Sequence, residues 1–405
     1  MVNALSAIFI SRNVTLLAIA QAFANSLQTM GIATTPLVAA IVLGEEHKAY
    51  ATMPLVFTQI GLMLATVPAS LLMGRFGRRL GFSLGALIGI AAGIVGVIAV
   101  YQASFWMLCL TAFLQGAAIA IGWYYRFAAA DATPPHMKAR AISFVLFAGV
   151  LSGVIGPESA KWAKDLLAPV TFAGVYVMFC VMSILTLVTV QGLNIPPPTV
   201  EERTGPARRI AEIARQPAFI VAVLSSMMGY GVMTTMMSAT PLAMIDCGFS
   251  FYDSATVIQF HVISMFAPAL FTGYLINRFG VLTIIFTGAL IQFGCLLIAM
   301  AGIGFHNFLL ANMLVGMGWN FCFIGGTTLL TTVYRPSERA KTQAAHDFLE
   351  YLMTAISTGT SGIVLATAGW GFVNLIALPM VAVVLLASSW LYLRHGPVAL
   401  VAHHK

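Results

Sequence analysis

Charged residues are scarce in this chain of 405 residues: Asp, Glu, Lys and Arg make up 8% of it, whereas 60% of the residues are hydrophobic. A typical soluble protein carries about 25% charged residues, so this composition excludes a soluble multidomain protein. A helix needs about 20 mostly apolar residues to cross a bilayer, because its backbone polar groups must be satisfied within the segment. The sequence therefore predicts an all-α membrane protein.

Paired cysteines and nucleotide-binding motifs are also missing. The five cysteines show no paired spacing, and we expect only Cys247 near an outer surface, so neither a disulfide framework nor a metal site is indicated. No Walker A phosphate loop is visible, and no nucleophile, base and orienting group occur together. We therefore expect no enzymatic activity, no cofactor and no ATP-driven mechanism.

What the sequence does contain is a series of twelve apolar runs, each long enough to span a bilayer. The first is too long for the apolar part of a signal peptide and is expected to stay in the protein. The expected spans are residues 14–43, 51–73, 81–101, 104–127, 141–162, 170–192, 218–245, 254–276, 281–303, 307–333, 343–366 and 371–393.

Basic residues gather on one side of these spans. If the N-terminus is cytoplasmic, all but three of the 20 Lys and Arg lie on the cytoplasmic side, and Lys48, Lys161 and Lys164 lie outside. This bias predicts that the N- and C-termini are cytoplasmic. The net charge of +7 is then the ordinary positive-inside bias and does not indicate nucleic-acid binding.

The chain also repeats itself. Residues 74–81 form a basic, glycine-punctuated turn whose Arg-Phe-Gly core recurs in residues 273–280, with Arg278 placed 278 − 75 = 203 positions after Arg75. The repeat predicts two tandem units of six helices. We expect the first in residues 1–193, a cytoplasmic linker in 194–217 that includes an amphipathic portion at the membrane surface, and the second in 218–405.

Twelve helices in two halves, with a basic turn after the second and a weaker copy after the eighth, resemble the major facilitator superfamily of secondary transporters. The first turn resembles the Gly-x-Leu-Ala-Asp-Arg-Phe-Gly-Arg-Arg signature of that family, but Ser70 replaces the leading Gly, Gly74 replaces the Asp, and Asn277 stands at the Asp position of the second copy. The resemblance implies two pseudo-symmetric six-helix bundles. It also implies a gating role for Arg75, Gly77, Arg78, Arg79, Asn277, Arg278 and Asp347.

Two further motifs of the family are partly present. Leu114-Gln115-Gly116 resembles a segment that often carries an arginine three residues before the Gln, where this chain has Ala112. Residues 149–157 resemble the glycine-and-proline motif of proton antiporters, with the glycines displaced. A plain packing role for these glycines is the alternative, because small residues let membrane helices approach closely.

Ionisable residues within apolar spans are functional candidates, because burying them is costly. We expect Glu158, His261 and Glu350 to be candidates for proton coupling. The alternatives are a structural Glu158–Lys161 pair, a His261 bonded to a neighbouring helix, and structural pairing of Asp347 with arginines at the cytoplasmic side. Arg126 and Asp131 are expected to be interfacial anchors.

Neutral amides and aromatic rings predict the kind of solute. Gln21, Asn25 and Gln28 form one amide face on the first helix, which suits an uncharged polar molecule, and aromatic residues of both halves suit a flat one. The candidate cavity residues are Gln21, Asn25, Gln28, Trp123, Tyr230, Gln259, Trp319 and Asn320.

The resulting hypothesis is a monomeric, proton-coupled secondary transporter of a small organic solute. Residues 229–268 resemble bacterial multidrug and small-molecule carriers of the superfamily, a group similar to bacterial riboflavin uptake carriers. The resemblance implies a location in a bacterial inner membrane. A flavin uptake carrier, a multidrug/proton antiporter and a non-transporting receptor or scaffold are the alternatives. The short loops argue against the receptor, because they offer a partner little surface.

Overall fold

The computed structural model describes residues 11–134, 138–195 and 208–395, and this part of the chain contains helices and no strands. The helices are long and mostly apolar, and they are joined by short turns. In chain order they are α2 (Arg12–His47), η2 (Lys48–Tyr50), α3 (Met53–Phe76), α4 (Arg78–Tyr101), α5 (Phe105–Gly122), α6 (Tyr125–Asp131), α7 (Lys138–Ala163), α8 (Ala173–Gln191), α9 (Ile210–Ala214), α10 (Pro217–Asp246), α11 (Phe251–Phe266), α12 (Ala269–Phe279), α13 (Val281–Met300), α14 (Phe305–Thr331), η5 (Pro336–Glu338), α15 (Arg339–Leu375) and α16 (Leu378–His395).

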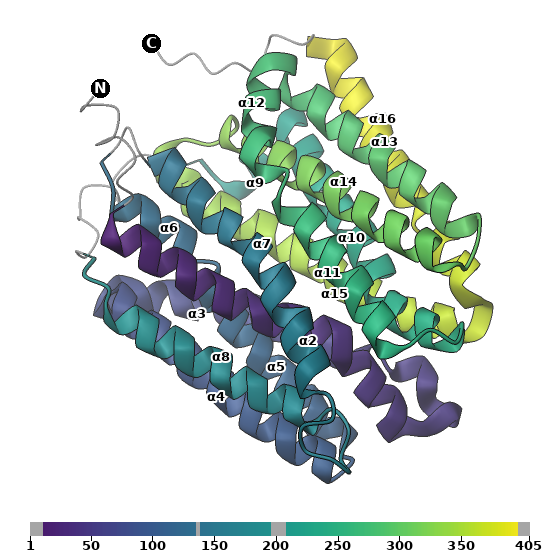
Figure 1. Ribbon diagram of the computed structural model, residues 1–405. Coiled ribbons are helices and arrows are strands. Elements are labelled where there is room, and N and C mark those ends of the chain that lie inside the picture. The colour runs from purple at the N-terminus through teal and green to yellow at the C-terminus, as the bar shows by residue number, and fades with distance from the viewer. Residues whose placement is uncertain (1–10, 135–137, 196–207, 396–405) are drawn as a thin grey trace, which may run out of the picture.

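These helices pack as two bundles, one built from α2–α8 and the other from α10–α16 (Figure 1). Within the first bundle α3 packs on α5, α4 on α8 and α2 on α7, whereas in the second α13 packs on α14 and α10 on both α14 and α15. The bundles meet where α7 contacts α11, α3 contacts α15 and α2 contacts α10. The exact limits of the linker between the bundles stay a prediction, because part of it lies outside the described residues.

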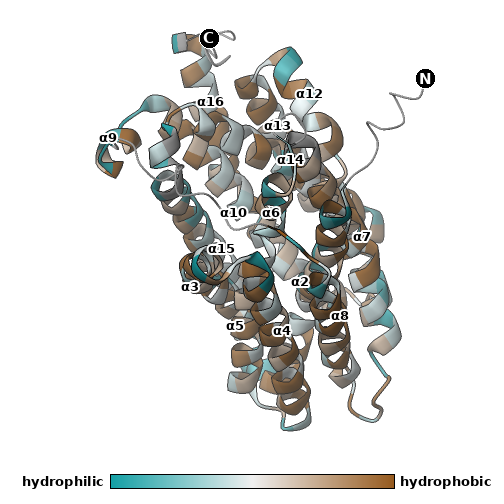
Figure 2. Ribbon diagram, turned by 90° about the vertical axis from the view of Figure 1, so that its left-hand side faces the viewer, coloured by the Kyte–Doolittle hydropathy of each residue, from teal (hydrophilic) through white to brown (hydrophobic). Residues whose placement is uncertain are grey.

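The apolar character of the helices fits a bilayer. Figure 2 shows hydrophobic residues over the middle of the helices and hydrophilic ones gathered toward their ends. In the described residues, ten helical stretches are long and apolar enough to span a membrane, and α11 with α12 add one more that is bent by 42°. One of the ten covers 54 residues and joins α15 to α16. The described residues thus contain ten or eleven candidate spans, and the predicted twelve require that this stretch crosses the membrane twice, at α15 and at α16.

Three of the predicted spans have different internal structure in the molecule. The fourth is interrupted at Trp123 and Tyr124, between α5 and α6. The eighth breaks before Pro268, whose ring cannot continue the hydrogen-bonding ladder of α11. The eleventh helix, α15, continues beyond the predicted limit to Leu375 and contains a non-helical residue at Gly369.

The internal repeat is visible in the backbone. Gly77 ends α3 with φ 90° and ψ 160°, and Gly280, 203 positions later, ends α12 with φ 86° and ψ 149°. A positive φ is strained for residues with a Cβ atom, so both basic turns require glycine at this position. The end of the molecule that carries these two turns is called the basic end below. The end that carries Lys48, Lys161 and Lys164 is called the lysine end.

The glycines of α7 serve close packing. A Cβ atom at Gly156 would overlap the Thr29 side chain of α2, and one at Gly149 would lie 2.7 Å from the Phe266 ring of α11. Small residues at these positions therefore let α7 lie against a helix of each bundle. The packing alternative accounts for these contacts.

Candidate functional site

A cavity lies between the two bundles, where α2, α3 and α5 face α10 and α15. It is small, about 30 Å³, so the bundles are closed around it. Three predicted cavity residues, Gln28, Trp123 and Tyr230, line it. The full lining is Gln28, Ile32, Leu55, Thr58, Gln59, Leu62, Gln115, Trp123, Tyr230, Met233, Thr234, Met237, Ser238, Tyr351 and Thr358.

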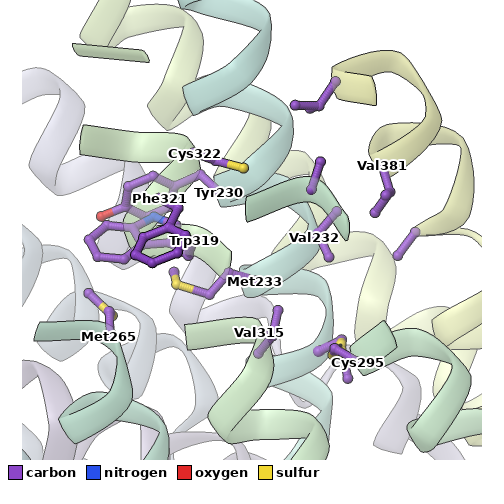
Figure 3. Close-up of a cluster of buried hydrophobic side chains, with 14 of the residues drawn as sticks. Tyr230, Val232, Met233, Met265, Cys295, Val315, Trp319, Phe321, Cys322 and Val381 are labelled. Carbon is purple, nitrogen blue, oxygen red and sulfur yellow. The ribbon is translucent and has the colours of Figure 1, made fainter. Parts of the chain in front are cut away.

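Aromatic rings form one wall of this region. Tyr230 on α10 meets Trp319 edge to face, with ring centroids 5.1 Å apart (Figure 3). Trp319 also stacks on Phe323, with ring centroids 4.9 Å apart. The Trp319 side chain is buried, yet its indole N–H has no hydrogen-bond partner within the described residues. Trp319 therefore supports Tyr230 from behind and is not itself part of the cavity lining.

Glutamine side chains form part of the opposite wall. Gln115 on α5 is 2% exposed, and its Nε2 donates a hydrogen bond of 2.5 Å to the Leu27 carbonyl of α2. It fits there because Gly31 leaves room for it: a Cβ at Gly31 would collide with the Gln115 carboxamide. Sequence reasoning noted Gln115 only for its neighbouring motif, because the space it occupies is created by another helix.

Gln59 is a second cavity residue that the sequence did not single out. It lies on α3 and its Oε1 accepts a hydrogen bond of 3.2 Å from the Thr354 hydroxyl of α15. This bond joins the two bundles directly at the cavity. The pairing of α3 with α15 is decided by tertiary packing, so no local signal in the sequence identifies it.

Ionisable groups of α15 gather beside the cavity. His346 is 2% exposed, and its Nδ1 lies 3.0 Å from Asp347 Oδ1 while its Nε2 lies 2.7 Å from Ser226 Oγ on α10. Glu350 lies one helical turn further along α15 and is equally buried. Its Oε2 atom lies 3.8 Å from His346 Nε2 and has no hydrogen-bond partner in the described structure. The predicted gating residue Asp347 thus pairs with a histidine of its own helix.

Arg126 of the first bundle faces this acidic group. Its guanidinium lies over the rings of Trp123 and Phe127, at 5.2 Å and 4.8 Å, and its buried Nε has no hydrogen-bond partner among the described residues. Its positive charge interacts electrostatically with the carboxyl of Glu350. Arg126 therefore acts across the junction of the bundles, and its expected role as an anchor at the membrane interface stays a prediction.

The other two proton-coupling candidates lie away from the cavity. Glu158 is near the end of α7 with its side chain 53% exposed, and its Oε1 accepts a bond of 2.8 Å from Lys161 Nζ. This geometry matches the structural alternative. His261 is fully buried within the second bundle, where its Nδ1 lies 2.8 Å from the Asn312 carbonyl oxygen of α14. Coupling roles for both stay predictions, whereas Glu350 is the candidate placed beside the cavity.

Most of the remaining predicted cavity residues are bound to protein groups. Gln21 Nε2 donates a hydrogen bond of 2.7 Å to Asn25 Oδ1, so these two amides of α2 are bonded to one another. Asn320 donates to the Met265 carbonyl at 2.8 Å and accepts from Thr272 at 2.7 Å. Gln259 on α11 is half-buried and is not part of the cavity lining.

The predicted gating arginines form contacts within each bundle. Arg78 pairs with Asp131 at 2.6 Å, and Arg79 donates to Gln191 at 3.0 Å. Arg78 therefore obtains a carboxylate partner from α6 although Gly74 replaces the usual Asp. The weaker copy has Arg278, which donates to the Tyr274 hydroxyl at 3.1 Å. Other residues of these turns are Arg75, stacked on Phe76, and the exposed Asn277.

At the lysine end, all three lysines contact the opposite bundle. Lys48 Nζ lies 2.6 Å from Asp246 Oδ1 at the end of α10, and Lys161 Nζ donates to the Thr256 hydroxyl of α11 at 2.9 Å. Lys164 Nζ lies 5.9 Å from the ring centroid of Phe172, 5.8 Å from that of Phe251 and 5.7 Å from that of Tyr252. These contacts hold the bundles together at the lysine end.

At the basic end, the described part of the linker binds the second bundle. Arg208 Nη2 lies 2.6 Å from Glu338 Oε2 and also donates to the Val333 carbonyl at 2.9 Å. Lys341 Nζ donates to the Arg208 carbonyl. The hydrogen bond from Arg208 holds the pKa of the Glu338 carboxyl well below its usual range.

Two bundles of apolar helices around a shared central cavity define a membrane transport protein. The chain belongs to the Major Facilitator Superfamily, whose family model matches residues 14–358. It is a multi-pass membrane transporter, as the resemblance implied, and its relatives imply a small-molecule substrate.

Individual relatives agree with this assignment. A riboflavin transporter of Brucella anthropi is 37% identical over 383 residues, which cover 92% of this chain and 94% of that protein. An uncharacterized MFS-type transporter of Bacillus subtilis is 28% identical over 89% of this chain and 86% of its own length.

Among solved structures, an auto-inhibited peptide transporter of the POT family aligns with a TM-score of 0.68 at 11% identity over 98% of this chain and 99% of its own. A Major Facilitator Superfamily transporter in the outward conformation aligns with a TM-score of 0.61 at 16% identity, covering 93% of this chain and 97% of its own. These two likenesses concern the fold alone.

Proposed function

We propose that this protein carries a flavin, with riboflavin as the reference substrate, across a bacterial inner membrane. The observation that carries the proposal is the 37% identity to a riboflavin transporter over almost the whole chain. The cavity supports it, because aromatic rings and neutral amides line a space between the bundles that suits a flat, uncharged, polar molecule.

Transport proceeds in this proposal by alternating access, with the basic end in the cytoplasm as the positive-inside rule predicts. The present arrangement is closed at the lysine end, where lysines of the first bundle contact the second. A cavity of about 30 Å³ does not hold a three-ring molecule. The bundles therefore separate around Gln59 and Thr354 before a flavin binds.

Proton coupling is assigned to Glu350 in this proposal. The carboxyl is buried beside the cavity, it lies near His346 of its own helix, and it faces Arg126 of the other bundle. A protonation change at Glu350 alters the attraction between the bundles, because Arg126 is charged throughout the physiological pH range. The proton would thereby bias the equilibrium between the two states of the transporter.

Transport by the purified protein in sealed liposomes tests the proposal. We expect riboflavin to raise the melting temperature of the detergent-solubilised protein, and uptake into liposomes to respond to a pH gradient. Empty liposomes serve as the control. Stabilisation by organic cations or drugs without stabilisation by riboflavin would favour the multidrug alternative, whereas binding without uptake would favour a receptor.

A further inference from the structure

Three glutamines of the first bundle line one part of the cavity: Gln28 on α2, Gln59 on α3 and Gln115 on α5. We propose, resting on the flavin function above, that these amides recognise the cyclic imide edge of the ring system. That edge presents an acceptor, a donor and an acceptor in sequence, namely a carbonyl, an N–H and a second carbonyl. Carboxamides supply both donors and acceptors and are suited to such an edge.

Gln115 is the fixed member of this group. Its Nε2 donates to the Leu27 carbonyl, and this bond determines which way round the amide lies, because a carbonyl oxygen accepts only from the amide nitrogen. The Oε1 atom is left with no hydrogen bond from the described residues, and Gln115 lines the cavity. It therefore offers an acceptor that is already oriented before the ligand arrives, and an imide N–H is its complement.

Gln28 is the adaptable member. It lies on the same helix as Leu27 and lines the cavity, and its carboxamide forms no hydrogen bond with any described residue. Both of its polar ends are thus free for a ligand. Gln59 is held from the other bundle by Thr354, so the third amide becomes fully free when α3 and α15 separate.

Charge supports the same ligand chemistry. All side chains that line the cavity are neutral, and its polar members are amides and hydroxyls. A neutral imide is matched by neutral partners, whereas a phosphorylated flavin would bring a dianion to a cavity without a cation in its lining. The site therefore selects an uncharged ring with an intact imide.

Binding of modified flavins to the purified protein tests this inference. Riboflavin and 5-deazariboflavin both retain the imide edge, so we expect them to bind with similar affinity. N3-methylriboflavin has lost the imide N–H and leaves the Gln115 acceptor buried without a partner, so we expect it to bind about 10- to 100-fold more weakly. Dissociation constants follow from quenching of flavin fluorescence.

Two variants assign the effect to residues. Gln115→Leu and Gln28→Leu should each weaken riboflavin binding about 10-fold and should reduce the preference for riboflavin over N3-methylriboflavin. Gln21→Leu is the matched control on α2, because Gln21 is bonded to Asn25 and does not line the cavity, and it should keep the preference. The Gln28 variant removes no bond within the described protein, so it remains informative if Gln115→Leu fails to fold.

The outcomes are distinguishable. Equal binding of riboflavin and N3-methylriboflavin by the unmodified protein would overturn imide recognition and leave the flavin function standing. If both glutamine variants still prefer riboflavin over N3-methylriboflavin, groups other than these glutamines recognise the imide edge. Failure of riboflavin and 5-deazariboflavin to bind at all would overturn the proposed function and, with it, this inference.

Discussion

Removing the lysine contacts at the lysine end should open that end of the transporter. Lys48, Lys161 and Lys164 each bind a group of the second bundle, through an ion pair of 2.6 Å, a hydrogen bond of 2.9 Å and the rings of Phe251 and Tyr252, respectively. We consider the triple variant in which all three lysines are replaced by alanine. Its substitutions remove these contacts between the bundles, together with contacts within the first bundle to Glu45, Glu158 and Phe172. Only the contacts between the bundles depend on whether the lysine end is closed.

The size of the effect follows from the exposure of each contact. The Lys48 and Asp246 side chains are 25% and 42% exposed, which places this pair among surface ion pairs worth about 0.2 to 1 kcal/mol. The hydrogen bond of Lys161 contributes on the order of 0.5 to 1 kcal/mol after solvent screening. The rings around Lys164 contribute about 0.5 to 1 kcal/mol. The total of roughly 1 to 3 kcal/mol corresponds to a shift of about 5- to 150-fold in the ratio of closed to open molecules.

Cysteine cross-linking between the bundles measures this ratio. Leu37 on α2 and Leu242 on α10 are buried in the same apolar cluster near the lysine end, so cysteines at these two positions should cross-link while that end is closed. We expect the triple variant to cross-link more slowly. Lys341→Ala is the control, since Lys341 binds the linker at the basic end. An unchanged cross-linking rate in the triple variant would refute the idea that these contacts hold the closed state.

Three further predictions concern other parts of the molecule. A cysteine at Arg78 should react with a membrane-impermeant thiol reagent only after permeabilisation, and labelling in intact cells would contradict the proposed topology. Glu350→Gln should retain flavin binding but lose uptake driven by a pH gradient, because the variant cannot release a proton. Glu158→Gln should reduce uptake little, because the Glu158 side chain is exposed. Full gradient-driven uptake by the Glu350 variant would show that Glu350 is not the proton-coupling residue. Glu338→Gln should lower the melting temperature at neutral pH, because Arg208 stabilises the charged carboxylate. Because the pKa of the Glu338 carboxyl is depressed in the folded protein, the stabilisation is complete above about pH 4.5 and is lost as the pH falls below that value. The unmodified protein and the variant should therefore have similar melting temperatures in acid. A constant difference in melting temperature at all pH values would contradict the assignment.

The sequence by itself determined the class of protein. Continuous apolar runs of about 20 residues, in a chain with 60% hydrophobic residues, indicate membrane-spanning helices, because a helix satisfies its backbone polar groups within the segment. The 203-residue repeat predicted two related bundles. The equivalent positive-φ glycines Gly77 and Gly280 confirm the repeat at the level of the backbone. Gln28, Trp123 and Tyr230, three of the residues that the sequence predicted for a cavity, line the space between the bundles.

Only the tertiary structure decided which polar residues share a site. Glu158 and Glu350 look alike in sequence, yet the first is exposed beside Lys161 and the second is buried near Arg126, because depth depends on where each helix ends and on which helices surround it. Gln115 has its position because Gly31 of another helix makes room for it, and Gln59 meets Thr354 because α3 packs on α15. Such contacts join residues that are up to 295 positions apart. Local periodicity identifies the buried face of a helix, but the partner of that face is selected by packing across the whole molecule.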